Sequence, residues 1–177
     1  MSKFVLYVNL PKYLHEWATH QLGDPVTFPQ YSNENAVIRS FLQKLPAGVS
    51  PDVRTDGATA VAIPDSASKP VEYYNYMGDR GKLAVVEVIK DLFTRALWND
   101  INQLEKSPVG LNQLIAAWCE MHGIGLDRVE TVRQRYYRIR KAYYKHGINL
   151  KKSSRQHNHD SVDFQVSETE SNNHTQQ

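Results

Sequence analysis

The longest regular pattern in the chain lies between Arg80 and Leu104. Its apolar residues recur at steps of three and four, the spacing that places side chains on one face of an α-helix. They are Val85, Ile89, Leu92, Phe93, Leu97 and Ile101. The sequence therefore predicts one long helix in the middle of the chain, broken by Ser107-Pro108, with different kinds of structure before and after it.

The residues before this helix alternate between strand-like and helix-like segments. Three short segments are rich in β-branched and aromatic residues or bounded by proline, as strands are. These strand candidates are Phe4–Leu10, Pro25–Pro29 and Ala58–Pro64. Phe4–Leu10 is apolar at both odd and even positions, which predicts a central strand. Helical spacing predicts two helices between the strands, Tyr13–Leu22 and Asn33–Leu45, with Asn33 as the cap of the second and Pro46 as its end.

After the long helix, the pattern predicts only helices, Leu111–His122 and Arg128–His146. The fold class is therefore α+β: a small N-terminal sheet of about three strands with helices, followed by a helical portion. We expect the divisions to be an α/β portion (1–79), a helical portion (80–150) and a polar, aromatic-poor tail (151–177) that is disordered.

Composition places the chain among ordinary globular proteins. Of its 177 residues, 41% are hydrophobic and 23% charged, enough apolar side chains to bury a core. Cys119 is the only cysteine, which excludes an internal disulfide and a cysteine-based zinc site. The histidines do not form a metal set either, so no metal and no cofactor are expected. With neither a signal peptide nor a long apolar span, we expect a cytoplasmic location and no membrane partner.

The charge is unevenly distributed along the chain. Residues 109–155 contain ten lysines and arginines against three acidic residues, a net charge of +7. Residues 1–108 carry −1, and residues 156–177 carry −4. One basic segment in an otherwise near-neutral chain predicts a polyanionic partner at that place only.

The two C-terminal helices are separated by a short turn, His122–Leu126. Gly123 allows the positive φ that a tight turn between helices needs, and Ile124 next to it can fill the angle between them. Asp127 is the predicted cap of the second helix, with Glu130 as its capping-box partner. One apolar stripe is expected along that helix: Val129, Val132, Tyr136, Ile139 and Tyr143.

The opposite face of this helix carries side chains suited to nucleic acid. A helical wheel places five polar residues opposite the stripe: Thr131, Gln134, Arg138, Lys141 and Lys145. Others flank it: Arg133, Tyr137, Arg140 and Tyr144 on one side, and Arg135 on the other. Arginine can bind guanine and glutamine can bind adenine through two hydrogen bonds, while lysine and peripheral arginine neutralise phosphates.

Residues 111–146 resemble the helix-turn-helix family of DNA-binding proteins. That family has a small residue four positions before a turn glycine, an aliphatic residue after the glycine, and two spaced aliphatic residues in the recognition helix. The matching residues here are Cys119, Gly123, Ile124, Val129 and Val132, with Trp118 as the buried neighbour; Cys119 stands where alanine is usual. The resemblance implies that the second helix enters the major groove and that Arg80–Leu104 is the third helix of the bundle.

These observations predict sequence-selective binding to double-stranded DNA. The expected contact residues are Thr131, Arg133, Gln134, Arg135, Tyr137, Arg138, Arg140, Lys141 and Lys145. Arg133, Arg135, Arg140 and Lys145 are assigned to phosphates, and Thr131, Gln134, Arg138 and Lys141 to bases. Tyr137 is predicted either to contact DNA or to pack on the protein. Glu16 is expected to have no part in binding.

One such helix buries too little surface for tight specific binding, so we expect a homodimer or a second contact from elsewhere in the chain. The predicted role is that of a transcriptional regulator. In size and layout the chain is also similar to the accessory proteins of bacterial mobile elements.

Three alternatives remain open. The basic helix can be an ordinary solvated surface. It can also dock RNA or an acidic protein, which would make the chain an adaptor. Finally, the N-terminal portion can be a small enzyme of nucleic-acid metabolism, which close-set carboxylates near His15 or His20 would favour. No nucleophile motif or phosphate-binding loop supports this last alternative, so no enzymatic activity is predicted.

Overall fold

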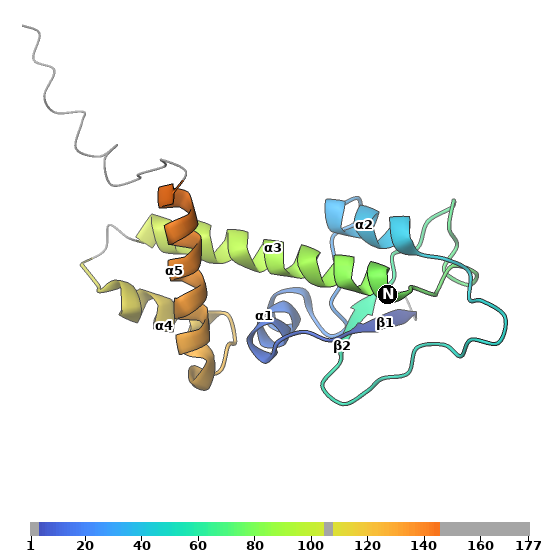
Figure 1. Ribbon diagram of the computed structural model, residues 1–177, viewed down its shortest axis with the longest axis horizontal. Coiled ribbons are helices and arrows are strands. Elements are labelled where there is room, and N and C mark those ends of the chain that lie inside the picture. The colour runs from blue at the N-terminus through green and yellow to red at the C-terminus, as the bar shows by residue number, and fades with distance from the viewer. Residues whose placement is uncertain (1–3, 105–107, 146–177) are drawn as a thin grey trace, which may run out of the picture. The chain divides into compact units, whose positions relative to one another are not determined.

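The computed structural model describes residues 4–104 and 108–145. The fold is α+β and mostly helical (Figure 1). In chain order its elements are β1 (Val5–Val8), α1 (Lys12–Leu22), α2 (Asn33–Phe41), β2 (Thr59–Ala62), α3 (Asp79–Leu104), α4 (Leu111–Met121), the 3₁₀ turn η1 (Leu126–Arg128) and α5 (Val129–Lys145). Among these, no helix combines the length and apolar character needed to cross a bilayer.

The sheet has two strands in the described part of the chain, where about three were expected. β1 and β2 are antiparallel, with Val5 opposite Ala62 and Val8 opposite Thr59. The third candidate, residues 25–29, contributes only a single parallel bridge from Val26 to Val61. Proline stands at both ends of that segment and has no N–H to donate, which keeps the pairing from extending into a ladder. β1 is consequently an edge strand rather than the central strand predicted.

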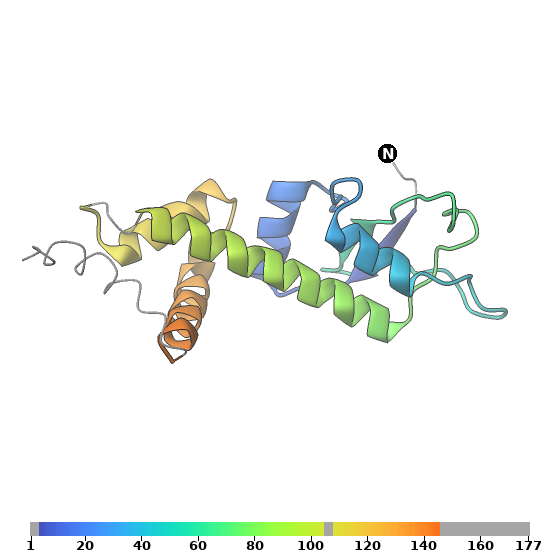
Figure 2. The ribbon, with the colours of Figure 1, turned by 90° about the horizontal axis from the view of Figure 1, so that it is seen from above.

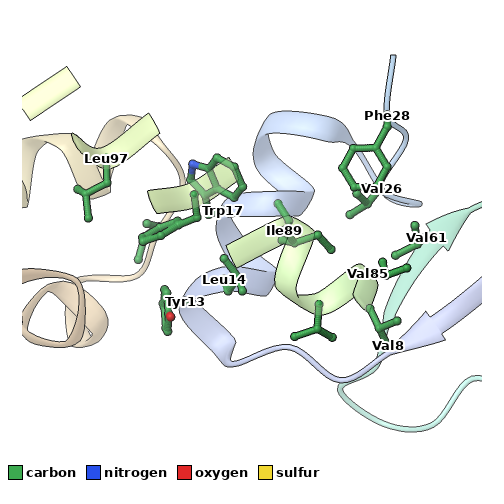
Figure 3. Close-up of a cluster of buried hydrophobic side chains, with 14 of the residues drawn as sticks. Val8, Tyr13, Leu14, Trp17, Val26, Phe28, Val61, Val85, Ile89 and Leu97 are labelled. Carbon is green, nitrogen blue, oxygen red and sulfur yellow. The ribbon is translucent and has the colours of Figure 1, made fainter. Parts of the chain in front are cut away.

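α3 is the long central helix, and α1, α2, α4 and β1 pack against it (Figure 2). The predicted apolar face of this helix is confirmed: five of its six residues are buried and Leu92 is partly buried. In its first half, Val85 and Ile89 lie among Leu14 of α1 and Val8 and Val61 of the sheet (Figure 3). α4 and the start of α5 lie at the other end of the helix in both ribbon views.

An aromatic cluster centred on Phe93 joins the two halves of this core. The Phe93 ring meets Tyr13 and Trp17 of α1 edge-on, with centroids 5.3 and 5.4 Å away. On its other side it meets Trp118 of α4 edge-on at 5.6 Å. The described residues up to Arg140 form one compact unit, and Lys141–Lys145 are the described part of a second. The division at residue 79 stays a prediction.

The ends of α2 differ from the sequence prediction. Ser32, not Asn33, is the N-cap, and its hydroxyl accepts a hydrogen bond from the N–H of Asn35 at 3.2 Å. The helix ends at Phe41 instead of Leu45, because Leu42 is already extended. There the ammonium of Lys69 donates to the carbonyls of Arg39 and Leu42 at 2.6 and 2.9 Å, satisfying groups that the helix end leaves open. The predicted tail (151–177) and His146 lie outside the described residues.

Candidate nucleic-acid interface

The turn between α4 and α5 has the predicted glycine geometry. Gly123 has a φ of +69°, in the region that favours glycine. Ile124 is 3% exposed, and its N–H donates to the carbonyl of Cys119 at 2.9 Å. The glycine and the aliphatic plug after it are thus confirmed in the positions expected from the sequence.

The predicted capping box at the start of α5 is wrong. Asp127 lies inside η1, a helical turn whose own N-cap is Gly125, and its carboxylate pairs with Arg128 at 3.1 Å. Glu130 contacts Arg133 and Gln134 one turn further along α5. Because the 3₁₀ turn already has helical geometry, Asp127 is not at the boundary where a capping side chain acts.

α1 holds this turn from outside. A carboxylate oxygen of Glu16 accepts the N–H of Gly125 at 3.0 Å. The ring of His20 lies against Gly123, where an added Cβ would be 2.5 Å from a ring carbon. Local sequence patterns gave no sign of either contact, since Glu16 and Gly125 are 109 residues apart. Glu16, expected to have no part in binding, therefore helps to fix the entry into α5.

We predict that Gly123→Ala lowers the free energy of unfolding by about 3 kcal/mol, from the left-handed backbone and the collision with His20 together. Chemical denaturation measures the change. Gly57→Ala is the matched control, because Gly57 has a φ of +80° with open space at its Cβ, and should cost only about 1–2 kcal/mol. Equal losses in the two variants would show that His20 does not press on the turn.

The end of α4 is anchored to α3 by polar and aromatic contacts. The indole N–H of the buried Trp118 donates to the carboxylate of Asp100 at 2.8 Å. His122, at the end of the helix as predicted, stacks on the Trp118 ring with centroids 4.1 Å apart. The Cys119 thiol beside them is buried, and burial raises its pKa to about 11. The thiol is therefore neutral near pH 7 and packs as a small apolar group.

The inner face of α5 follows the predicted stripe. Val132 and Tyr136 are fully buried, and Val129 and Ile139 are partly buried against the core. The Tyr136 ring stacks on Trp98 of α3 with centroids 5.8 Å apart. The last residue of the stripe, Tyr143, is 38% exposed instead of buried.

The opposite face of α5 is exposed. Six predicted contact residues are exposed: Thr131, Gln134, Tyr137, Arg138, Lys141 and Lys145. The other three are half-buried: Arg133, Arg135 and Arg140. α5 carries six lysines and arginines against one carboxylate, Glu130. Within residues 4–104 and 108–145, Arg138 and Lys141 take part in no salt bridge.

Glu130 engages two of the predicted contact residues. Its carboxylate pairs with Arg133 one turn along the helix and accepts a hydrogen bond from the Gln134 amide at 3.2 Å. The bonds from Arg133 and then from Gln134 lower the pKa of Glu130, and the same pair raises the pKa of Arg133. The sequence pattern predicts Glu130 as a capping-box partner, so this competition for Arg133 and Gln134 was not expected from it.

Two flanking residues, Tyr137 and Arg135, differ in their contacts with the rest of the protein. Tyr137, which is 44% exposed, donates its hydroxyl to the side-chain oxygen of Asn112 in α4 at 3.4 Å. Arg135 is half-buried, and its Nε has no hydrogen-bond partner in the described part of the chain. Arg138, near the middle of α5, is exposed and takes part in no salt bridge among the described residues.

The histidines near the sheet make structural contacts. His15 Nδ1 lies 2.9 Å from the hydroxyl of the buried Thr59, and His20 lies on the turn glycine. Across the described residues, no three His, Cys, Asp or Glu side chains are grouped so that they could hold a metal ion. No family model matches the chain, and no significant match was found among curated proteins or solved structures.

Proposed function

We propose that this protein binds double-stranded DNA through the exposed face of α5. In this proposal α4, the turn at Gly123 and α5 form a helix-turn-helix unit, with α3 as the third helix of the bundle. The observation that carries it is the division of α5 into a face anchored by Val132 and Tyr136 and an unobstructed face bearing Thr131, Gln134 and Arg138.

The dimensions and charge of α5 suit a DNA groove. Its 17 residues span about 25 Å. The major groove of B-DNA is about 12 Å wide and admits one α-helix. A surface helix stabilised by ion pairs usually carries both signs of charge, whereas α5 has a single acidic residue in its first turn. The excess of positive charge on α5 supports a polyanionic partner.

We assign base reading to Thr131, Gln134, Arg138 and Lys141, and phosphate contacts to Arg133, Arg135, Arg140 and Lys145. Glu130 occupies donor groups of Gln134 and Arg133, so these two side chains must leave it before the same groups bind DNA. Phosphates would also repel the Glu130 carboxylate. Arg138 needs no such exchange and is therefore the strongest candidate for a direct contact. Tyr137, held by Asn112, has a positioning role between α4 and α5.

The proposed biological role is that of a DNA-binding regulator or an accessory protein of a mobile element, acting in the cytoplasm. A single α5 buries too little surface for tight specific binding, so the proposal requires a second copy or a second contact.

The proposal is tested by selecting bound fragments from a random duplex library, followed by titrations at several salt concentrations. We expect one short motif to be enriched. The logarithm of the affinity should fall linearly with the logarithm of salt, by about 0.9 for each phosphate contacted. Equal competition by RNA or by an unrelated polyanion, or an affinity that does not change with salt, would contradict it.

A further inference from the structure

The outer edge of β1 has unpaired backbone groups. The carbonyl of Phe4 accepts the N–H of Ile63 at 3.1 Å, so these two residues form a hydrogen-bonded pair. Because such pairs alternate along an antiparallel ladder, Leu6 and Val8 also direct their backbone N–H and C=O groups toward β2. Val5 and Tyr7 therefore direct their N–H and C=O groups away from β2. On the outer side of β2, the bridge to Val26 satisfies the C=O of Ala60 and the N–H of Ala62, at 2.8 and 2.9 Å. In the described parts of the chain no group plays that role for Val5 or Tyr7.

The sequence of this strand lacks the usual protection of an edge. Exposed edges normally carry a lysine, a proline or a bulge that discourages another strand from pairing. β1 reads VLYV, with no charge and no proline, and its pattern predicts a strand covered on both sides. A sheet of two short strands also falls short of the three or more that usually give a stable sheet.

Apolar surface continues from this edge onto the neighbouring elements. A hollow of about 470 Å³ is lined in part by Tyr7, Val53, Leu83 and Val86. Val53 and Leu83 on its walls are 76% and 65% exposed. Lys82 and Asp52, 2.7 Å apart, pair with each other in the same lining and leave its apolar residues uncovered. Exposed apolar side chains next to an open strand edge are typical of a protein–protein interface.

We propose that a second copy of this chain pairs with the open edge of β1, so that two sheets join into one antiparallel sheet of four strands. Antiparallel pairing of a strand with itself is two-fold symmetric, so each copy supplies the donors and acceptors that the other lacks. Val5 then lies opposite the partner's Tyr7, and the two exchange backbone hydrogen bonds. In this dimer, Val53 and Leu83 of each copy pack over the hollow of the other copy. The dimer goes beyond the DNA proposal and supplies the second α5 that the latter requires.

The test measures the mass of the full chain in solution by light scattering over a range of protein concentrations, without DNA. The expected mass is twice that of one chain. Amide exchange at Val5 and Tyr7 should slow as concentration rises, while exchange at Leu6 and Val8 stays constant, because only the former pair gains partners. Val5→Lys adds a charge that discourages strand pairing, and Tyr7→Pro removes an N–H that the partner would use, so each variant should be a single chain. Both should keep the wild-type circular dichroism spectrum, because the backbone groups of Val5 and Tyr7 take no part in the ladder to β2.

Tyr73→Lys is the matched control, because Tyr73 is 68% exposed and lies outside the strand; its mass should equal that of the wild type. A wild-type chain that stays single at every concentration overturns the proposal. A dimer that persists in Val5→Lys also overturns the proposal. If Tyr7→Pro does not fold, Val5→Lys alone decides the test. If a single chain binds duplex DNA, the proposed DNA binding is supported and the proposed dimer is refuted.

Discussion

Arg138→Glu is expected to weaken binding to the selected duplex by roughly 100-fold, or about 3 kcal/mol. The change removes an exposed cation at the centre of the outer face of α5 and places a carboxylate against the phosphates. Since Arg138 has no salt bridge among the described residues, its reversal breaks no ion pair there, and the thermal midpoint should stay unchanged. Fluorescence anisotropy with the selected duplex measures the affinity.

Two further variants determine what Arg138 contacts. Lys12→Glu reverses the charge of an exposed residue outside α5 and should leave the affinity nearly unchanged. Arg138→Lys keeps the charge but loses the two-pronged hydrogen bonding of arginine. If Arg138 reads a guanine, this variant relaxes specificity at one position; if it contacts a phosphate, the affinity changes little. Wild-type affinity in Arg138→Glu would exclude the exposed face of α5 as the DNA-binding surface.

Phe93→Ala is expected to cost about 4–5 kcal/mol in the free energy of unfolding. Removing a buried phenylalanine ring typically costs about 3–5 kcal/mol, and the three edge-on ring contacts of Phe93 raise the loss toward the upper end. A domain of this size is stable by only about 5–15 kcal/mol, so the variant should be close to unfolded. Urea denaturation followed by tryptophan fluorescence measures the loss.

The matched control is Asn99→Ala, an exposed position on the same helix, which should change stability by no more than about 0.5 kcal/mol. Phe93→Leu keeps most of the volume and should recover most of the loss. If Phe93→Ala proves as mild as Asn99→Ala, Phe93 does not join α1 to α4 as the ring contacts indicate.

The elements predicted best are those whose determinants are local. The apolar spacing along α3 and α5 reports which face is buried, because a helix brings residues three and four apart to one side. Gly123 and Ile124 were identified for a similar reason, since a tight turn between helices needs a positive φ and a plug. The exposed face of α5 was predicted for the same reason, because residues that do not belong to the apolar stripe lie on the opposite side of the helix.

The errors arose where a partner far along the chain decides the outcome. A strand's neighbours are not encoded in its own residues, so β1 was predicted to be central and residues 25–29 to be a short third strand. The role of Asp127 depends on whether the turn before α5 is helical, which composition alone does not reveal. The hold of Glu16 on Gly125 joins residues 109 positions apart and leaves no periodic trace.

By itself, then, the sequence determined the long central helix, the two helices after it, the glycine turn between them and the concentration of positive charge on α5. Each of these follows from residues within a few turns of one another. Only the tertiary structure decided that α1 braces that turn and that Glu130 occupies Arg133 and Gln134. It also decided that, within the described residues, β1 ends the sheet with unpaired backbone groups. These depend on which distant surfaces meet, a choice made by the packing of the whole core around Phe93 and not by any one segment.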